Sequence, residues 1–157
     1  MQAFHFSLNR VRNYKSQVLD REKKVLGALQ RQRDEILDRI DVLEAYRIQK
    51  SAELGRKQST GATMSELRQY DYLIESARNQ IHAAREELHK AEKALEAQRQ
   101  VVLSIYQEKT GMDKLEEKQA EEYRVRAAKA NENEIMQVIS NKLASDGGKG
   151  NSLSGIA

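Results

Sequence analysis

The sequence contains no cysteine, no proline and no tryptophan, and it has only two phenylalanines and six tyrosines among 157 residues. An ordinary chain of this length carries about eight prolines. Their absence favours uninterrupted helix, which proline breaks. Without cysteine the chain forms no disulfide and offers no thiol nucleophile or thiolate metal ligand. The few bulky apolar residues argue against the deep core that surrounds an enzyme active site.

Long apolar runs are absent as well. The longest extends over residues 101–106 and is interrupted by Ser104, whereas a membrane-spanning helix needs about 20 apolar residues. The first residues show no apolar core of a secretory signal, and the missing cysteines fit a reducing compartment. We therefore expect a cytoplasmic protein. Charged residues make up 32% of the chain, a composition typical of long helices and coiled coils.

Glycine marks the divisions of the chain. Four of the eight glycines lie in the last eleven residues, so we expect residues 145–157 to be a disordered tail. Gly55 and Gly61 bracket a polar segment, after which residues 63–66 read Thr-Met-Ser-Glu, a capping box that starts a helix. The prediction is one ordered domain, residues 1–144, with a helix at about 4–57, a turn at 58–63 and a helix at about 64–143.

Both predicted helices carry a heptad pattern. In the second helix eleven of the twelve a and d residues are apolar, which is typical of a coiled coil. The a series is Leu67, Ile74, Ile81, Leu88, Leu95 and Val102, and the d series is Tyr70, Ala77, Ala84, Ala91, Gln98 and Ile105. The first helix is less regular, with nine apolar residues of fourteen when Leu8 is taken as a and Val11, Val18, Val25 and Tyr46 fall at d.

Two helices joined by a short linker pack as antiparallel neighbours. The predicted fold is therefore all-α, a long antiparallel two-helix coiled-coil hairpin. Because the second helix is longer, we also expect a C-terminal helical overhang of about 25 residues, whose amphipathic sequence suits docking to another surface.

Catalytic chemistry finds little support. His82 and His89 are seven residues apart, about 10 Å along a helix axis, which is too far to share one metal ion. No phosphate-binding glycine loop is present, and two helices side by side form no dry pocket to shift a pKa. We expect no enzyme activity, no catalytic residue, no metal and no cofactor.

Charge and aromatic residues point to binding instead. The first 33 residues contain eight basic and two acidic side chains. Only Tyr14 is interleaved among them, so an acidic protein surface is a better partner than nucleic acid, with a merely solvated face as the alternative. Near the turn, Tyr72 and Leu73 fall outside the predicted seam, where apolar groups mark an interaction patch. Tyr46 and Tyr70 fall at d and could equally fill the seam.

The opening pattern of Phe4, Phe6, Leu8, Arg10-Val11-Arg12 and Tyr14, together with the capped turn and a late stretch ending in Tyr123, resembles the flagellar export protein FliJ family. The resemblance implies a non-enzymatic part of the flagellar type III export apparatus, similar to the stalk (gamma subunit) of rotary ATPases. Its implied partners are the hexameric export ATPase FliI, the export gate protein FlhA and free export chaperones. The protein would then lie at the inner face of the cell membrane through these partners.

Carried onto this chain, the resemblance implies two binding surfaces. The surface for the gate would contain Leu43, Tyr46, Lys50, Tyr70, Tyr72, Leu73, Ala77 and Gln80. The surface for the ATPase would contain Phe4, Phe6, Leu8, Arg10, Val11, Arg12 and Tyr123, with the overhang of residues 118–143. The alternative is a general coiled-coil export chaperone or a homodimeric tether without an ATPase partner, which a sedimentation measurement of the free protein distinguishes from a monomeric hairpin.

Overall fold

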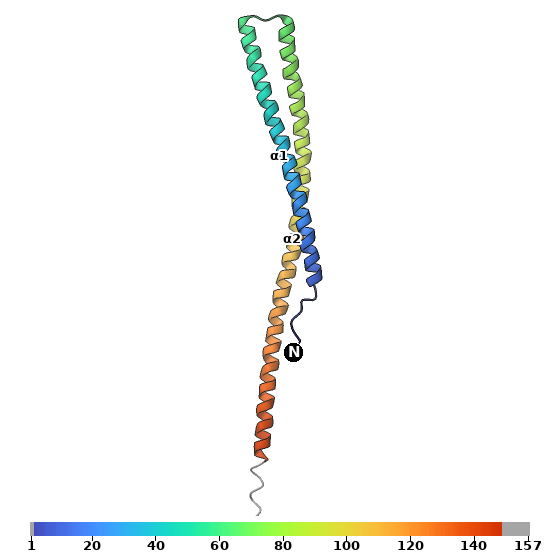
Figure 1. The fold of residues 1–157 in the computed structure, drawn as a ribbon, viewed down its shortest axis with the longest axis vertical. Helices are drawn as coiled ribbons and strands as arrows, with labels where there is room; N and C mark the ends of the chain where they lie inside the picture. The colour runs from blue at the N-terminus through green and yellow to red at the C-terminus, as the bar shows by residue number, and fades with distance from the viewer. Residues whose placement is uncertain (1, 149–157) are drawn as a thin grey trace, which may run out of the picture. The chain divides into compact units, whose positions relative to one another are not determined.

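The computed structural model describes residues 2–148 and consists of two α-helices, α1 (Asn9–Thr60) and α2 (Met64–Gly147). No strand occurs in that range. The helices have 52 and 84 residues, are in contact and are joined by one short turn (Figure 1). The chain forms two compact units, one of residues 15–107 and one in which the N-terminal residues up to 14 join those from 108 onward. The predicted all-α class and helical hairpin are confirmed.

The helix ends differ from the expected ones. Helix α1 begins at Asn9 rather than near residue 4, because residues 2–6 form a non-helical segment that buries Phe6. At its other end α1 continues to Thr60, three residues beyond the expected position. Helix α2 includes residues 145–147 of the predicted tail. The remainder of that tail, from residue 149, lies outside the described residues.

The turn is fixed by local hydrogen bonds. Gly61 has a φ of 98°, and its N–H donates to the carbonyl of Lys57 at 3.0 Å, which closes α1 with a left-handed residue. The hydroxyl of Thr63 then accepts a hydrogen bond from the backbone N–H of Glu66 at 3.2 Å. This confirms the predicted cap, which satisfies an N–H that has no partner inside the helix.

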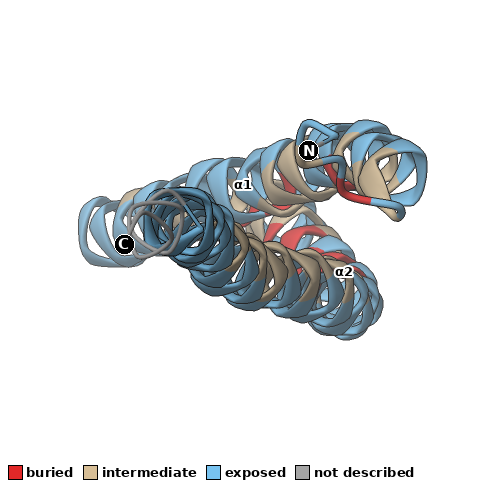
Figure 2. Cartoon of the chain, turned by 90° about the horizontal axis from the view of Figure 1, so that it is seen from below, coloured by how far each residue is buried: buried red, intermediate tan, exposed pale blue. Residues whose placement is uncertain are grey.

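In the unit of residues 15–107, α1 and α2 run antiparallel, and the buried residues lie where the helices face each other (Figure 2). The core alternates large and small side chains, since Ile36 and Ile40 of α1 pack with Ala84 and Ala91 of α2. All twelve a and d residues predicted for α2 are buried or partly buried, so that register is confirmed. Burying one such isoleucine contributes about 1.5–3 kcal/mol.

The register predicted for α1 is only half right. The predicted a residues face α2, but the predicted d residues Val11, Val25 and Tyr46 are exposed. The second inward row instead lies one residue later than the predicted d row and consists of Arg12, Leu19, Leu26, Arg33, Ile40, Arg47 and Leu54. In the corrected register this row is a, and Lys15, Glu22, Leu29, Ile36, Leu43 and Lys50 are d.

One polar layer interrupts the core of residues 15–107. The side-chain amide of Gln98 donates to the backbone carbonyl of Glu22 at 3.0 Å and also to the Glu22 carboxylate. Both residues occupy inward positions, so the layer aligns the two helices through a directional contact.

No helix in the described part of the chain is long and apolar enough to cross a membrane.

In the second unit, the N-terminal residues lie against α2. Phe6 is 3% exposed, and the Phe4 ring is 5.7 Å from that of Tyr123. The Tyr123 hydroxyl donates to the carbonyl of Gln2. Farther along α2, every residue from 131 to 148 is exposed. Burial in this unit is therefore confined to the stretch of α2 that the N-terminal segment covers.

Candidate docking groove

Two ion pairs show how the sides of the hairpin are arranged. Arg39 of α1 pairs with Glu87 of α2 at 2.7 Å. Each of the two residues directly precedes an inward a residue, so both occupy g positions. Glu44 pairs with Arg85 at 2.9 Å, and both are e positions. We therefore call the side formed by the g and c positions of both helices the g flank, and the side formed by the e and b positions the e flank.

A groove lies on the g flank between the two helices, with a volume of about 310 Å3. Tyr46 on α1 and Leu73 and Gln80 on α2 are g residues, and they form its walls. The d residue Ala77 is 2% exposed and closes the floor. The full lining is Val42, Leu43, Tyr46, Leu73, Ser76, Ala77 and Gln80.

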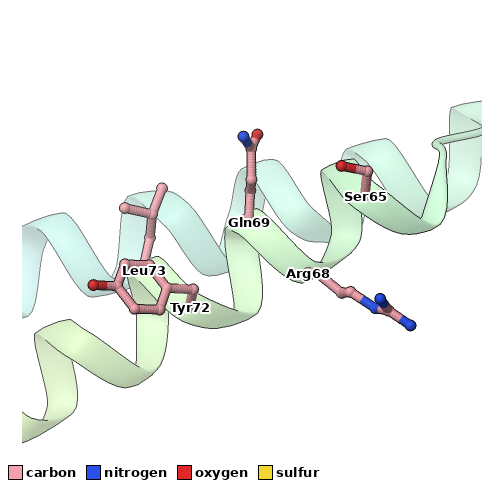
Figure 3. A pocket seen from close by; sticks show the side chains of 5 residues that line it. All are labelled: Ser65, Arg68, Gln69, Tyr72 and Leu73. Carbon is pink, nitrogen blue, oxygen red and sulfur yellow. The ribbon is translucent and has the colours of Figure 1, made fainter.

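The surface of α2 beside this groove is also hollowed. Tyr72 is 72% exposed, and a shallow depression lies on each side of its ring. One depression shares Leu73 with the groove, and the other shares Ser76 and Gln80. Figure 3 shows Leu73 extending from the same side of α2 as Gln69, while Arg68 points the opposite way. The groove and the depressions beside Tyr72 therefore form one continuous hollowed surface.

A small charged cluster supports the α1 wall. The Lys50 ammonium donates a hydrogen bond to the Glu53 carboxylate at 3.2 Å and lies 5.4 Å from the centre of the Tyr46 ring. The hydrogen bond to Glu53 raises the pKa of Lys50, and the same bond lowers the pKa of Glu53. A hydrogen bond from Tyr70 lowers the pKa of Glu53 further. The cluster holds the Tyr46 ring through a cation–π contact.

The structure thus brings together five of the residues expected on the gate surface, Leu43, Tyr46, Leu73, Ala77 and Gln80. Lys50 and Tyr70 belong to the supporting cluster, and Tyr72 stands beside the groove. Sequence reasoning missed Val42 and Ser76, which also line it. Both are c residues, and in the corrected α1 register Val42 at c and Tyr46 at g lie on the same flank of the hairpin.

The residues expected on the ATPase surface divide into two groups. Phe6 is buried, and Arg12 lies over its ring at 5.4 Å while forming ion pairs with Glu116 and Asp113. Phe4 contacts Tyr123, and Leu8 is partly buried. These side chains hold the unit together. Arg10 and Val11 are exposed and are accessible to a partner.

The lining of the groove is mostly apolar, with a few polar groups. Its lining contains amide, hydroxyl and apolar groups but no carboxylate, histidine or lysine. In residues 2–148 no three His, Asp or Glu side chains come together where they would hold a metal ion. Such a surface offers a partner an apolar anchor site with a few hydrogen-bonding groups at the rim.

The model of a protein family described as "Flagellar FliJ protein" matches residues 4–135. The chain is a member of the FliJ family. The match covers most of both helices, the turn and the groove. No curated protein and no solved structure matches the chain. This FliJ family member is accordingly a component of the flagellar protein export apparatus.

Proposed function

We propose that this FliJ family member is a non-enzymatic adaptor of flagellar protein export, in which the groove of the g flank binds the export gate protein FlhA. The observation that carries the proposal is the grouping of Tyr46, Leu73 and Gln80 around one exposed apolar groove. Tyrosine and leucine side chains in such a groove supply contact area at low entropic cost. Tyr72 extends the same surface.

The second part of the proposal assigns binding of the FliI hexamer to the unit that contains both the N-terminal segment and residues from 108 onward. The support is chemical. Val125, Ile135, Ile139 and Leu143 leave apolar surface exposed on α2 there, and Arg10 and Val11 of the same unit are exposed on α1. The protein would act as a stalk, assist delivery of export chaperones with their substrates, and reside at the inner face of the membrane through its partners.

Binding of purified FlhA to the full-length protein tests the first part. Leu73→Ala should weaken binding about tenfold or more, because it removes one groove wall. The matched control is Leu103→Ala, a leucine on the e flank that is 47% exposed. It should change binding less than about twofold. Equal effects of the two substitutions, or no binding by the unaltered protein, would overturn the assignment of the groove.

The ATPase assignment has a separate test. The intact protein should raise the ATPase activity of purified FliI, and Val11→Asp should reduce this activation while leaving helicity unchanged, since Val11 is 41% exposed. Leu73→Ala should leave the activation unaltered. Sedimentation of the free protein should give a monomer of 18.0 kDa. A stable dimer without ATPase activation would favour a homodimeric tether.

A further inference from the structure

A second surface lies on the g flank, away from the groove. It occupies residues 15–33 of α1 and 89–107 of α2, both within the unit of residues 15–107. Along the g row of α1 the sequence runs from Tyr46 through Arg39 and Gln32 to Val25 and Val18. The Arg39–Glu87 ion pair therefore separates this surface from the groove.

The centre of this surface is apolar and built from small side chains. The g and c positions of the two helices hold Val18, Val25, Ala28, Ala94, Ala97 and Val101. Val25 is 45% exposed and Val101 is 42% exposed. Because g residues of the two helices share one flank, as the Arg39–Glu87 contact demonstrates, these side chains lie on the same side of the hairpin. Small residues in such a row allow another helix to approach closely.

The charges around this apolar centre have one sign. The c and f positions in the same stretch hold Arg21, Lys24, Arg31, Lys90 and Lys93, all exposed. The acidic residues of the stretch occupy other positions, with Asp20 and Glu96 at b, Glu92 at e and Glu22 inside the seam. We call the six apolar and five basic residues the basic strip.

The five basic residues have no acidic partner in the described part of the chain. In residues 2–148 none of them forms an ion pair, whereas Arg85 pairs with Glu44 and Arg99 with Glu96 on the e flank. Several positive side chains along an apolar row create a positive field that attracts an anionic partner.

We propose that the basic strip binds an amphipathic helix of a partner protein, with an apolar stripe that covers the valines and alanines and acidic residues that meet the lysines and arginines. Charge complementarity selects this occupant, because the five cations attract an acidic helix whose apolar stripe can bury the valines and alanines. The proposal does not depend on the function assigned to the groove.

The test uses the full-length protein and a labelled synthetic peptide of about 21 residues, with leucine at a and d and glutamate at e and g. Fluorescence anisotropy measures its affinity. Lys24→Glu with Lys93→Glu should lower the affinity about fivefold, since two favourable pairings become repulsive. The control is Lys129→Glu with Lys142→Glu, which changes the net charge equally at exposed positions outside the strip and should alter the affinity less than twofold.

Val25→Ser should lower the affinity about threefold, and circular dichroism should show unchanged helicity for each variant. Leu73→Ala should leave peptide binding unaltered. Failure of the groove to bind FlhA and failure of the basic strip to bind the peptide are therefore distinguishable. Absence of peptide binding would overturn the proposal, as would equal loss in both double variants or equal binding of a peptide with lysine in place of glutamate. Binding to phosphatidylserine vesicles or duplex DNA without binding of the acidic peptide would assign the strip to a lipid or nucleic-acid surface instead.

Discussion

The Arg39 guanidinium donates to the Glu87 carboxylate at 2.7 Å and thereby joins α1 to α2 across 48 residues of sequence. Each side chain is 52% exposed, so solvent screens the attraction. A double-mutant cycle with Arg39→Ala and Glu87→Ala should give a coupling energy of about 0.5 kcal/mol that falls as salt is added. Coupling above about 2 kcal/mol in urea unfolding would contradict an exposed pair.

Two glycines should respond to alanine with opposite signs. Gly61 has a φ of 98°, where an alanine is strained, so Gly61→Ala should destabilise the hairpin by about 1 kcal/mol. Gly55 lies inside α1 with no neighbouring atom within 4 Å of an added Cβ, so Gly55→Ala should stabilise it by up to about 1 kcal/mol. Thermal unfolding measures both. A gain for Gly61→Ala would contradict the left-handed turn.

The fold class and the whole register of α2 were predictable because its apolar residues recur at fixed intervals. The α1 register was not, because Arg12, Arg33 and Arg47 occupy inward a positions and made that row look polar. Arginine can do so because its aliphatic stem covers apolar surface while its charged end reaches an acid. Arg12 reaches Glu116, and Arg47 reaches Glu44 at 3.0 Å. A count of apolar residues treats arginine as polar and so misses a side chain that both covers apolar surface and forms an ion pair.

The apolar pattern of the sequence also predicts only part of the candidate site. Leu73 was placed outside the seam by its position in the regular α2 pattern, and the groove contains it. For Tyr46 the sequence left open whether it fills the seam, because the second inward row of α1 lies one residue later than the predicted d row that contains Tyr46. The late start of α1 was also missed, since burial of Phe6 depends on packing in a unit that includes residues more than 90 positions later in the chain.

A charge in the core tests the α2 register directly. Ile81 is 4% exposed, so Ile81→Asp should lower the free energy of unfolding by about 3–5 kcal/mol, through lost burial and an unpaired charge. Asn79→Asp adds the same acid two residues away at an exposed f position and should change it by less than about 1 kcal/mol. If chemical unfolding gave comparable losses of unfolding free energy for the two variants, Ile81 would not face α1.

The Lys50–Glu53 contact predicts a pH dependence at the groove. Since folding lowers the pKa of Glu53, the carboxylate's contribution to stability is present above the unfolded pKa and is lost as the pH falls through the folded one. Since folding raises the pKa of Lys50, its contribution is present below the unfolded pKa and is lost as the pH rises through the folded one. The pair should therefore be intact between about pH 5 and about pH 10.

Carboxyl NMR titration of the full-length protein measures this directly. The pKa of Glu53 should lie below the ordinary glutamate value, because Lys50 donates a hydrogen bond to its charged form. Lys50→Met keeps much of the apolar stem but removes the ammonium, so it should raise the pKa of Glu53 toward the ordinary value. It should also release the Tyr46 ring, seen as altered ring chemical shifts, because the cation beside that ring is gone. A Glu53 pKa that Lys50→Met leaves in place would mean that the contact is not formed in solution.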